Sequence, residues 1–261
     1  MKGSDSLSLT MPVGMLLLWI LWTAQADVDR AVSLWRQGKP AAAEAALRAI
    51  VSATPANAAA WKWLGVVHAS RSEHELAENP FREACRLAPA DPDACYFHGR
   101  NLYLLNRFES ALAVLEKTLP DDPQPWRIHL AMAQSLEALG RDAESEKQFH
   151  ASIAAGPKPG RPEDDPRLHY GVFLLRQGRT ADSLEALEQA PPSARSLSTQ
   201  GRALSQLGRL NDAAARLEKA IGLDSRDWNA HLLLGNVYQR LGRVADANRH
   251  LKLGEQGLKS P

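Results

Sequence analysis

Apolar residues recur at three- and four-residue intervals along most of the chain, and a turn-forming residue interrupts this pattern at regular distances. Such spacing is typical of amphipathic helices, and a period of about 20–50 residues predicts stacked supersecondary units. The seven interruptions, spaced by 34, 34, 34, 38, 30 and 34 residues, fall at Gly38, Ser72, Asn106, Gly140, Gly178, Gly208 and Gly242. Each repeat is therefore predicted to be a helix, a turn with positive φ and a second helix.

Small residues recur at two fixed positions relative to each turn. Seven residues before each turn stands Gly or Ala, and five residues after it stands Ala or Ser. Small side chains in both helices let the two backbones of a repeat approach closely. Nine residues after each turn a large apolar residue returns, and we expect it to fill the space between repeats: Leu47, Phe81, Leu115, Phe149, Leu187, Leu217 and Leu251.

This pattern resembles the tetratricopeptide repeat family over about Ala24 to Gly257. The family signature W-x2-L-G…A-x3-F…P is met in part by six repeats and nearly in full by Trp61, Leu64, Gly65, Ala77, Phe81, Ala84 and Pro89. The resemblance implies an all-α fold, a right-handed α-solenoid of about seven helix-turn-helix repeats. It also implies that the first helices line a concave groove, which the family uses chiefly to hold peptides or partner proteins.

The N-terminus differs from the repeats. Residues 12–22 read PVGMLLLWILW, an apolar run of near 11 residues, whereas a bilayer-spanning helix needs about 20. The run is followed by Ala24, Gln25 and Ala26, an A-x-A cleavage pattern. We therefore predict a signal peptide over 1–26 and a periplasmic or secreted protein. The alternative is an uncleaved anchor that leaves the protein on the outer face of a membrane.

The remaining chain is predicted to hold repeats one to four in 27–157 and repeats five to seven in 164–257. A Pro- and Gly-rich insertion at 158–163 separates them, as a hinge or as a rigid surface loop, and a tail covers 258–261. The last helix is expected to cap the array by itself, with self-association through a second copy as the alternative.

Charge and motifs limit the chemistry. Thirty-one basic residues oppose 30 acidic ones, a net charge of +1 that argues against nucleic acid as a partner and leaves membrane contact to an uncleaved N-terminal segment. The sequence contains no H-E-x-x-H, G-x-S-x-G, phosphate-loop or C-x-x-C motif, so we predict no enzymatic activity, no cofactor and no metal. Cys85 and Cys95 would form a disulfide if the chain is exported, or stay buried thiols.

The groove is therefore the expected working surface, and basic residues outnumber acidic ones on it. Its predicted partner-binding residues are Tyr96, Arg100, Tyr103, Arg127, Gln134, Arg176, Arg195, Arg202, Asn236 and Arg240. An arginine side chain can donate two parallel hydrogen bonds to one carboxylate, so an extended and somewhat acidic peptide would fit this groove. A helix face that only contacts solvent would show the same residues. We predict a non-enzymatic, exported scaffold or adaptor that binds a peptide or partner protein, with envelope assembly as its setting. The alternative is a groove-based receptor or regulatory subunit for a small anionic ligand or glycan.

Overall fold

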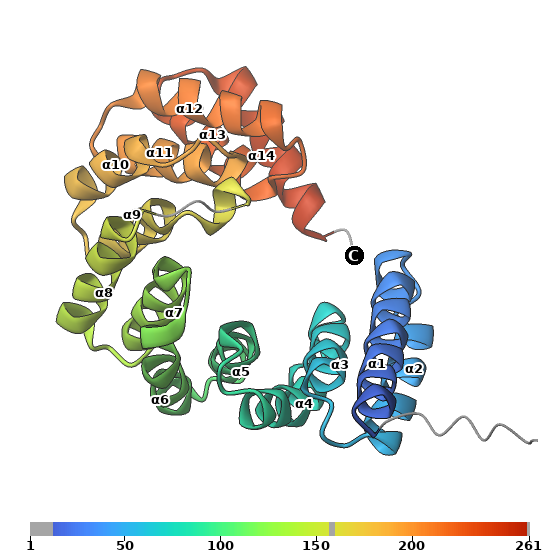
Figure 1. Cartoon of the computed structure of the whole chain (residues 1–261). Coiled ribbons are helices and arrows are strands. Elements are labelled where there is room, and N and C mark those ends of the chain that lie inside the picture. The colour runs from blue at the N-terminus through green and yellow to red at the C-terminus, as the bar shows by residue number, and fades with distance from the viewer. Residues whose placement is uncertain (1–12, 157–159, 260–261) are drawn as a thin grey trace, which may run out of the picture. The chain divides into compact units, whose positions relative to one another are not determined.

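The computed structural model describes residues 13–156 and 160–259, and this part of the chain is entirely helical (Figure 1). It contains fourteen α-helices, two short 3-10 helices and no strand. The α-helices are α1 Val13–Arg36, α2 Pro40–Ala53, α3 Ala58–Ser70, α4 His74–Leu87, α5 Pro92–Leu104, α6 Phe108–Thr118, α7 Pro125–Ala138, α8 Asp142–Ala154, α9 Pro166–Arg176, α10 Thr180–Gln189, α11 Ala194–Gln206, α12 Leu210–Leu223, α13 Trp228–Arg240 and α14 Val244–Lys259. The 3-10 helices are η1 Leu119–Asp121 and η2 Pro162–Asp164.

Consecutive helices pack in pairs, from α1 with α2 to α13 with α14, and each pair is one predicted repeat. The predicted positive φ between the paired helices is confirmed at all seven turns. It is 70–77° at the five glycines, 60° at Ser72 and 57° at Asn106. A residue in this left-handed region ends the first helix and allows the chain to reverse into the second.

The two helices of a pair begin differently. Five of the first helices start with a side-chain cap that accepts a backbone N–H: Asn57, Asp91, Asp165, Ser193 and Asp227. The second helices α2, α4, α6, α8, α10 and α12 follow a Lys, Glu or Arg that makes no side-chain cap bond. Capping residues in the linkers therefore mark the boundaries between repeats, and positive-φ residues mark the turn inside each repeat.

The small residues that recur before and after each turn let the two helices of a pair come into contact. A Cβ added at Gly201 in α11 would lie 2.5 Å from Leu217 of α12, and one added at Gly65 would lie 2.5 Å from Phe81. Leu217 is fully buried. These large residues contact the small residue of their own repeat and also reach the next repeat, as expected: the Phe81 ring lies 5.8 Å from that of Phe97, and the Phe149 ring lies 5.3 Å from that of Phe173. The glycines are needed because any side chain there would overlap the facing one.

The chain divides into two compact units, which we call the N-terminal block, residues 1–123, and the C-terminal block, residues 124–261. The first contains repeats one to three and the second contains repeats four to seven. The division falls one repeat before the insertion predicted at 158–163. Residues 158 and 159 of that insertion lie outside the described residues, and η2 covers its last part.

Residues 1–12 of the predicted signal peptide lie outside the described residues, as do 260–261 of the predicted tail, while α1 continues through Ala26 into the first repeat. Across the residues that the structure describes, no helix combines the length and the apolar character needed to cross a membrane. Cys85 and Cys95 are joined by a disulfide, with their Cα atoms 4.6 Å apart. This bond connects α4 of repeat two to α5 of repeat three.

Candidate functional site

The first helices of repeats five to seven form a groove in the C-terminal block. Helix α11 contacts both α9 and α13, so the three helices lie side by side (Figure 1). Together they enclose about 540 Å³, which we call the C-terminal groove. It is lined by Val172, Leu175, Arg176, Arg195, Ser198, Thr199, Arg202, Asn229, Leu232, Leu233 and Asn236. Most neighbouring lining positions within a helix differ by three or four residues, so each helix turns one face to the groove.

The groove has an apolar floor and a polar rim. Leu175 is buried, and Leu232 and Leu233 are half-buried between the helices. The polar side chains at Arg195 and Asn229 are exposed and reach solvent. Apolar surface with a few convergent polar groups is the usual composition of a binding site, so the groove can take up apolar side chains while orienting a polar backbone.

The three groove arginines differ in their partners. Arg176 donates to Glu137 of α7 over 2.6 Å. The guanidinium groups of Arg195 and Arg202 make neither an ion pair nor a hydrogen bond within the described part of the chain. A guanidinium carries five N–H donors in a fixed fork that matches a carboxylate. The guanidinium groups of Arg195 and Arg202 are therefore both available to a ligand.

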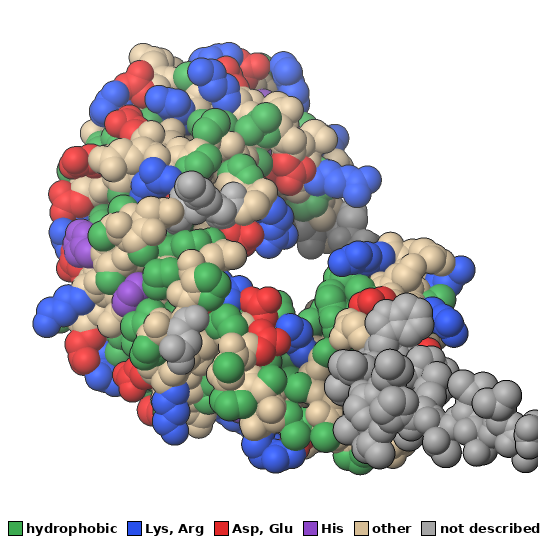
Figure 2. All heavy atoms as spheres, viewed as in Figure 1, with side chains coloured by type: hydrophobic (Ala, Val, Ile, Leu, Met, Phe, Trp, Pro, Cys, Tyr) green, Lys and Arg blue, Asp and Glu red, His purple; other side chains and the backbone are tan. Residues whose placement is uncertain are grey.

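Arginines at the turns behave in the opposite way. The residue after the turn glycine is an arginine in four repeats, and it pairs with the acid three residues later, at 2.6–2.9 Å: Arg141–Glu144, Arg179–Asp182, Arg209–Asp212 and Arg243–Asp246. Figure 2 shows Lys and Arg side chains interspersed with Asp and Glu over the C-terminal block. The positive charge of the turns is thus neutralised locally, whereas that of Arg195 and Arg202 is not.

The structure brings four of the predicted site residues together in this groove: Arg176, Arg195, Arg202 and Asn236. The other C-terminal candidates are not among the residues that line it. Arg240 donates to the backbone oxygen of Ser205, at 2.7 Å, and to its hydroxyl, at 2.9 Å, while Gln134 bonds His169. Arg127 lies on α7, also outside the lining, and is half-buried.

The remaining predicted residues belong to the N-terminal block, on α5. Tyr96, Arg100 and Tyr103 are half-buried there. The Tyr96 ring lies 5.7 Å from that of Phe97, and the Tyr103 ring lies 5.6 Å from that of Phe108. Aromatic neighbours hold both rings in place, so these three residues form a separate, more aromatic face.

Sequence reasoning missed Leu175, Thr199, Leu232 and Leu233 in the groove. The sequence did indicate their position, because each of these residues lies one, three or four positions from a predicted polar lining residue on the same helix. A leucine in an amphipathic helix is nevertheless expected in the core. Only the packing of three helices shows that these leucines face a groove.

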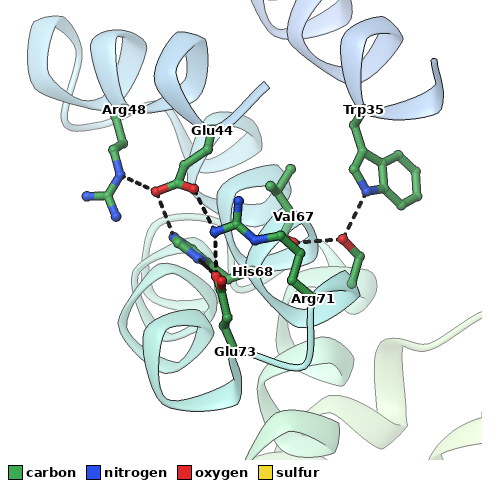
Figure 3. Close-up of polar contacts among 8 residues, drawn as sticks. Trp35, Glu44, Arg48, Val67, His68, Arg71 and Glu73 are labelled. Atoms are coloured by element: carbon green, nitrogen blue, oxygen red, sulfur yellow. Dashed lines mark hydrogen bonds and ion pairs between the residues drawn. The ribbon is translucent and has the colours of Figure 1, made fainter. Parts of the chain in front are cut away.

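A second polar cluster, which the sequence analysis did not single out, lies in the N-terminal block (Figure 3). His68, at the end of α3, is 1% exposed and its Nδ1 lies 2.7 Å from Glu73. Arg71 contacts both Glu73 and Glu44, and Glu44 also accepts from Arg48. The cluster therefore ties α2 of repeat one to the turn of repeat two.

Hydrogen bonds set the ionisation of this cluster. The Arg48 hydrogen bond is the main reason that the pKa of Glu44 is lowered, and the Arg71 hydrogen bond does the same for the pKa of Glu73. A histidine beside carboxylates resembles a general base, but His68 is sealed from solvent and offers a substrate no access. The cluster is a structural connection between two repeats.

No group of three or more His, Cys, Asp or Glu residues that could hold a metal occurs among the described residues. A family model described as Tetratricopeptide repeat matches residues 28–92 and 98–159, and one described as TPR repeat matches 201–242. The chain therefore belongs to the tetratricopeptide repeat family, whose members are generally non-enzymatic scaffolds that bind protein partners.

Solved structures share this fold at low sequence identity. PilF of Pseudomonas aeruginosa is 19% identical, with a TM-score of 0.63, and the match covers 77% of this chain and 92% of that one. A tetratricopeptide repeat protein from Parabacteroides merdae is 16% identical over 90% and 93% of the two chains, with a TM-score of 0.68. PilW, a type IV pilus biogenesis factor, is 18% identical over 91% and 95%, with a TM-score of 0.55. No curated protein matches the chain in sequence.

Proposed function

We propose that the chain is an exported scaffold that holds an extended, acidic segment of a partner protein in the C-terminal groove. The observation that carries this proposal is the presence of two exposed arginines, Arg195 and Arg202, that no acid of the described chain neutralises, beside an apolar floor. A partner with carboxylates and apolar residues in alternation would satisfy both features.

Each element of the groove has a role in such a complex. Arg195 and Arg202 would form charge-assisted hydrogen bonds with carboxylates of the segment. The amides of Asn229 and Asn236 make no hydrogen bond within the described chain and would bond the backbone of the extended segment. Leu232 and its neighbours would receive apolar side chains. An extended segment fits because its side chains alternate between the floor and solvent.

Two observations support export. The A-x-A pattern after an apolar run favours cleavage by signal peptidase. The Cys85–Cys95 disulfide belongs to an oxidising compartment, where such bonds persist. We therefore propose a periplasmic or secreted location, with assembly of an envelope complex as the setting in which the scaffold meets its partner. The likeness to PilF and PilW concerns the fold, and no partner is carried over from it.

Peptide binding tests the role of the groove directly. Fluorescent ten-residue peptides that alternate leucine with aspartate should bind the full chain with an affinity that falls as salt rises. The Arg195→Glu/Arg202→Glu variant should bind at least about tenfold more weakly, because charge-assisted hydrogen bonds are replaced by repulsion. Peptides with asparagine in place of aspartate should bind the wild type less tightly.

The matched control reverses the same amount of charge outside the groove. Lys219 and Arg226 are exposed, lie in the C-terminal block and do not line the groove. Lys219→Glu/Arg226→Glu should bind the acidic peptide nearly as well as the wild type does. Unchanged affinity in the groove variant, or equal losses in both variants, would exclude the arginine mechanism. Saturable binding of small anions with no peptide binding would favour the receptor alternative.

A further inference from the structure

The last repeat contains two facing histidines that do not line the groove. His231 of α13 and His250 of α14 lie with their Nδ1 atoms 3.0 Å apart, and their ring centroids are 5.1 Å apart. Both nitrogens therefore lie between the rings and point at each other. His231 is 6% exposed and His250 is half-buried, so the pair is part of the contact between the two helices.

Two facing imidazole nitrogens can share only one proton. In the neutral pair one ring donates its Nδ1–H, and the Nδ1 of the other ring accepts it. A first added proton can bind Nε2 of the donor ring and leaves this hydrogen bond intact. A second proton must bind the accepting Nδ1, so that two N–H groups of two positive rings face each other and the bond is lost.

Repeat four contains the same arrangement with a glutamine in place of the second histidine. His129 of α7 and Gln148 of α8 have the same positions relative to their turn as His231 and His250, and His129 Nδ1 is 2.7 Å from Gln148 Oε1. The amide oxygen only accepts, and a neutral or a protonated ring can donate its Nδ1–H to it. This bond survives protonation, so acid sensitivity requires a histidine on both helices.

The other titratable and charged side chains around the pair are Glu218 of α12, Tyr238 of α13, Arg243 of the turn, and Asp246 and Arg249 of α14. Both carboxylates are already engaged. Glu218 accepts the hydroxyl of Tyr238, and Asp246 pairs with both arginines. The two arginines of α11 line the groove instead. Burial is the largest cause that lowers the pKa of His250, followed by the charges of His231 and Arg249, while the two carboxylates act in the opposite direction.

Helix α14 also supports the floor of the C-terminal groove. A Cβ added at Gly254 of α14 would lie 2.7 Å from Leu232, which lines the groove, and one added at Gly257 would overlap the ring of Trp228. Both glycines thus bring α14 close to α13 on either side of the groove residue Asn229. Separation of α14 from α13 would leave Leu232 without this contact.

We infer that the His231–His250 pair makes the last repeat sensitive to mild acid, because its double protonation loosens α14 from α13 and weakens the hold of the groove on its partner. The loosening follows from the geometry of the pair, while its effect on a partner rests on the proposed function. A histidine of the unfolded chain has a pKa of about 6.5. The folded pair takes up its second proton only at lower pH, so opening of α14 becomes more favourable as the pH falls through this value.

Hydrogen exchange of the full chain at pH 7.5 and pH 5.5, corrected for the intrinsic pH dependence of amide exchange, tests the loosening. One proton withheld from the folded pair at pH 5.5 favours opening about tenfold, so the protection of the α14 amides should fall about tenfold. The amides of α8, behind the His129–Gln148 pair, should keep their protection. Equal protection of α14 at both pH values would overturn the inference.

The His250→Gln variant is the matched test, because it gives the last repeat the pair that repeat four has. At pH 7.5 it should protect α14 as the wild type does, which also shows that it is folded, and its protection should not fall at pH 5.5. His231→Gln should remove the response in the same way. A fall in α14 protection that persists in both variants would overturn the assignment to this pair.

Binding of the leucine–aspartate peptide at the two pH values tests the effect on the groove. Its carboxylates remain ionised at pH 5.5, so the wild type should bind it several-fold more weakly there, and His250→Gln should not. Equal wild-type affinity at both pH values would overturn the connection to the groove. Absence of peptide binding at both pH values, with the fall in α14 protection intact, would contradict the proposed function and leave the acid-sensitive pair supported.

Discussion

Gly201→Ala tests whether close contact between paired helices holds the repeats together. The new Cβ would lie 2.5 Å from Cγ and 2.9 Å from Cδ2 of Leu217, which is fully buried. Overpacking a core in this way costs about 1–3 kcal/mol, while replacing a helical glycine recovers about 0.4–1 kcal/mol from the unfolded chain. We therefore expect Gly201→Ala to reduce the free energy of unfolding by about 1–2 kcal/mol.

Gly222→Ala is the matched control, because Gly222 lies in α12 and a Cβ there meets no atom within 4 Å. It should raise the free energy of unfolding by about 0.4–1 kcal/mol. Urea unfolding followed by circular dichroism measures both variants, with the slope m checked for a change in cooperativity. Equal stability of Gly201→Ala and Gly222→Ala would refute the packing argument.

A double-mutant cycle identifies the atoms responsible. Leu217→Ala alone should cost about 2–5 kcal/mol, since it leaves a cavity in the core. In that background the added methyl group at position 201 has room, so Gly201→Ala should become neutral or stabilising. A cost that stays the same in both backgrounds would show that Leu217 is not the residue that the methyl group displaces.

Two further predictions concern the N-terminal block. The folded-state pKa of Glu73 is lowered, mainly by the hydrogen bond from Arg71, so its contribution to stability is complete above the carboxylate pKa of the unfolded chain and is lost as the pH falls through the folded value. The melting temperature of the wild type should therefore fall more steeply between pH 6 and pH 3 than that of Glu73→Gln. The control Glu116→Gln, at an exposed position, should keep the wild-type slope. Parallel curves for the wild type and Glu73→Gln would contradict this prediction. The Cys85–Cys95 bond closes a loop with a sequence separation of 10, so the Cys85→Ser/Cys95→Ser variant should lose about 2–3 kcal/mol of unfolding free energy. A reductant should lower the melting temperature of the wild type but not that of this variant, and an equal shift in both would point to another cause.

The turns show how far local sequence determines the fold. Five turns carry glycine, for which positive φ is inexpensive, and Asn106 belongs to the few other types that adopt it readily. Ser72 has no such preference but reaches a φ of 60° in the same place. The position of this turn was predictable from the period of the repeat. The helices packed on either side hold the serine in a conformation that its own preference would not select.

Repeat five shows the same difference between sequence and packing. The family models match no part of residues 160–200, yet α9 and α10 pair as the other repeats do. A Cβ at Gly171 would lie 2.5 Å from Leu187, and the turn at Gly178 has a φ of 76°. The small residue, the turn and the large residue kept their spacing, so the sequence was enough to predict the helix pair although its linkers differ in length.

The candidate site was predicted in part. Residue spacing placed Arg176, Arg195 and Arg202 on one face of the first helices, because helical geometry is local. Their pairing could not be predicted, since Glu137 is 39 positions from Arg176. The repeats stack at distances that sequence does not encode directly, and that stacking neutralises Arg176 while it leaves Arg202 available.

The sequence by itself therefore determined the helices, the turns and the identity of the small residues, because these follow from sterics within about one repeat. Only the tertiary structure decided which charges are compensated and which leucines face a groove. Those outcomes depend on atoms contributed by several helices at once. A single helix face cannot indicate whether its neighbour will cover it, pair with it or leave it open.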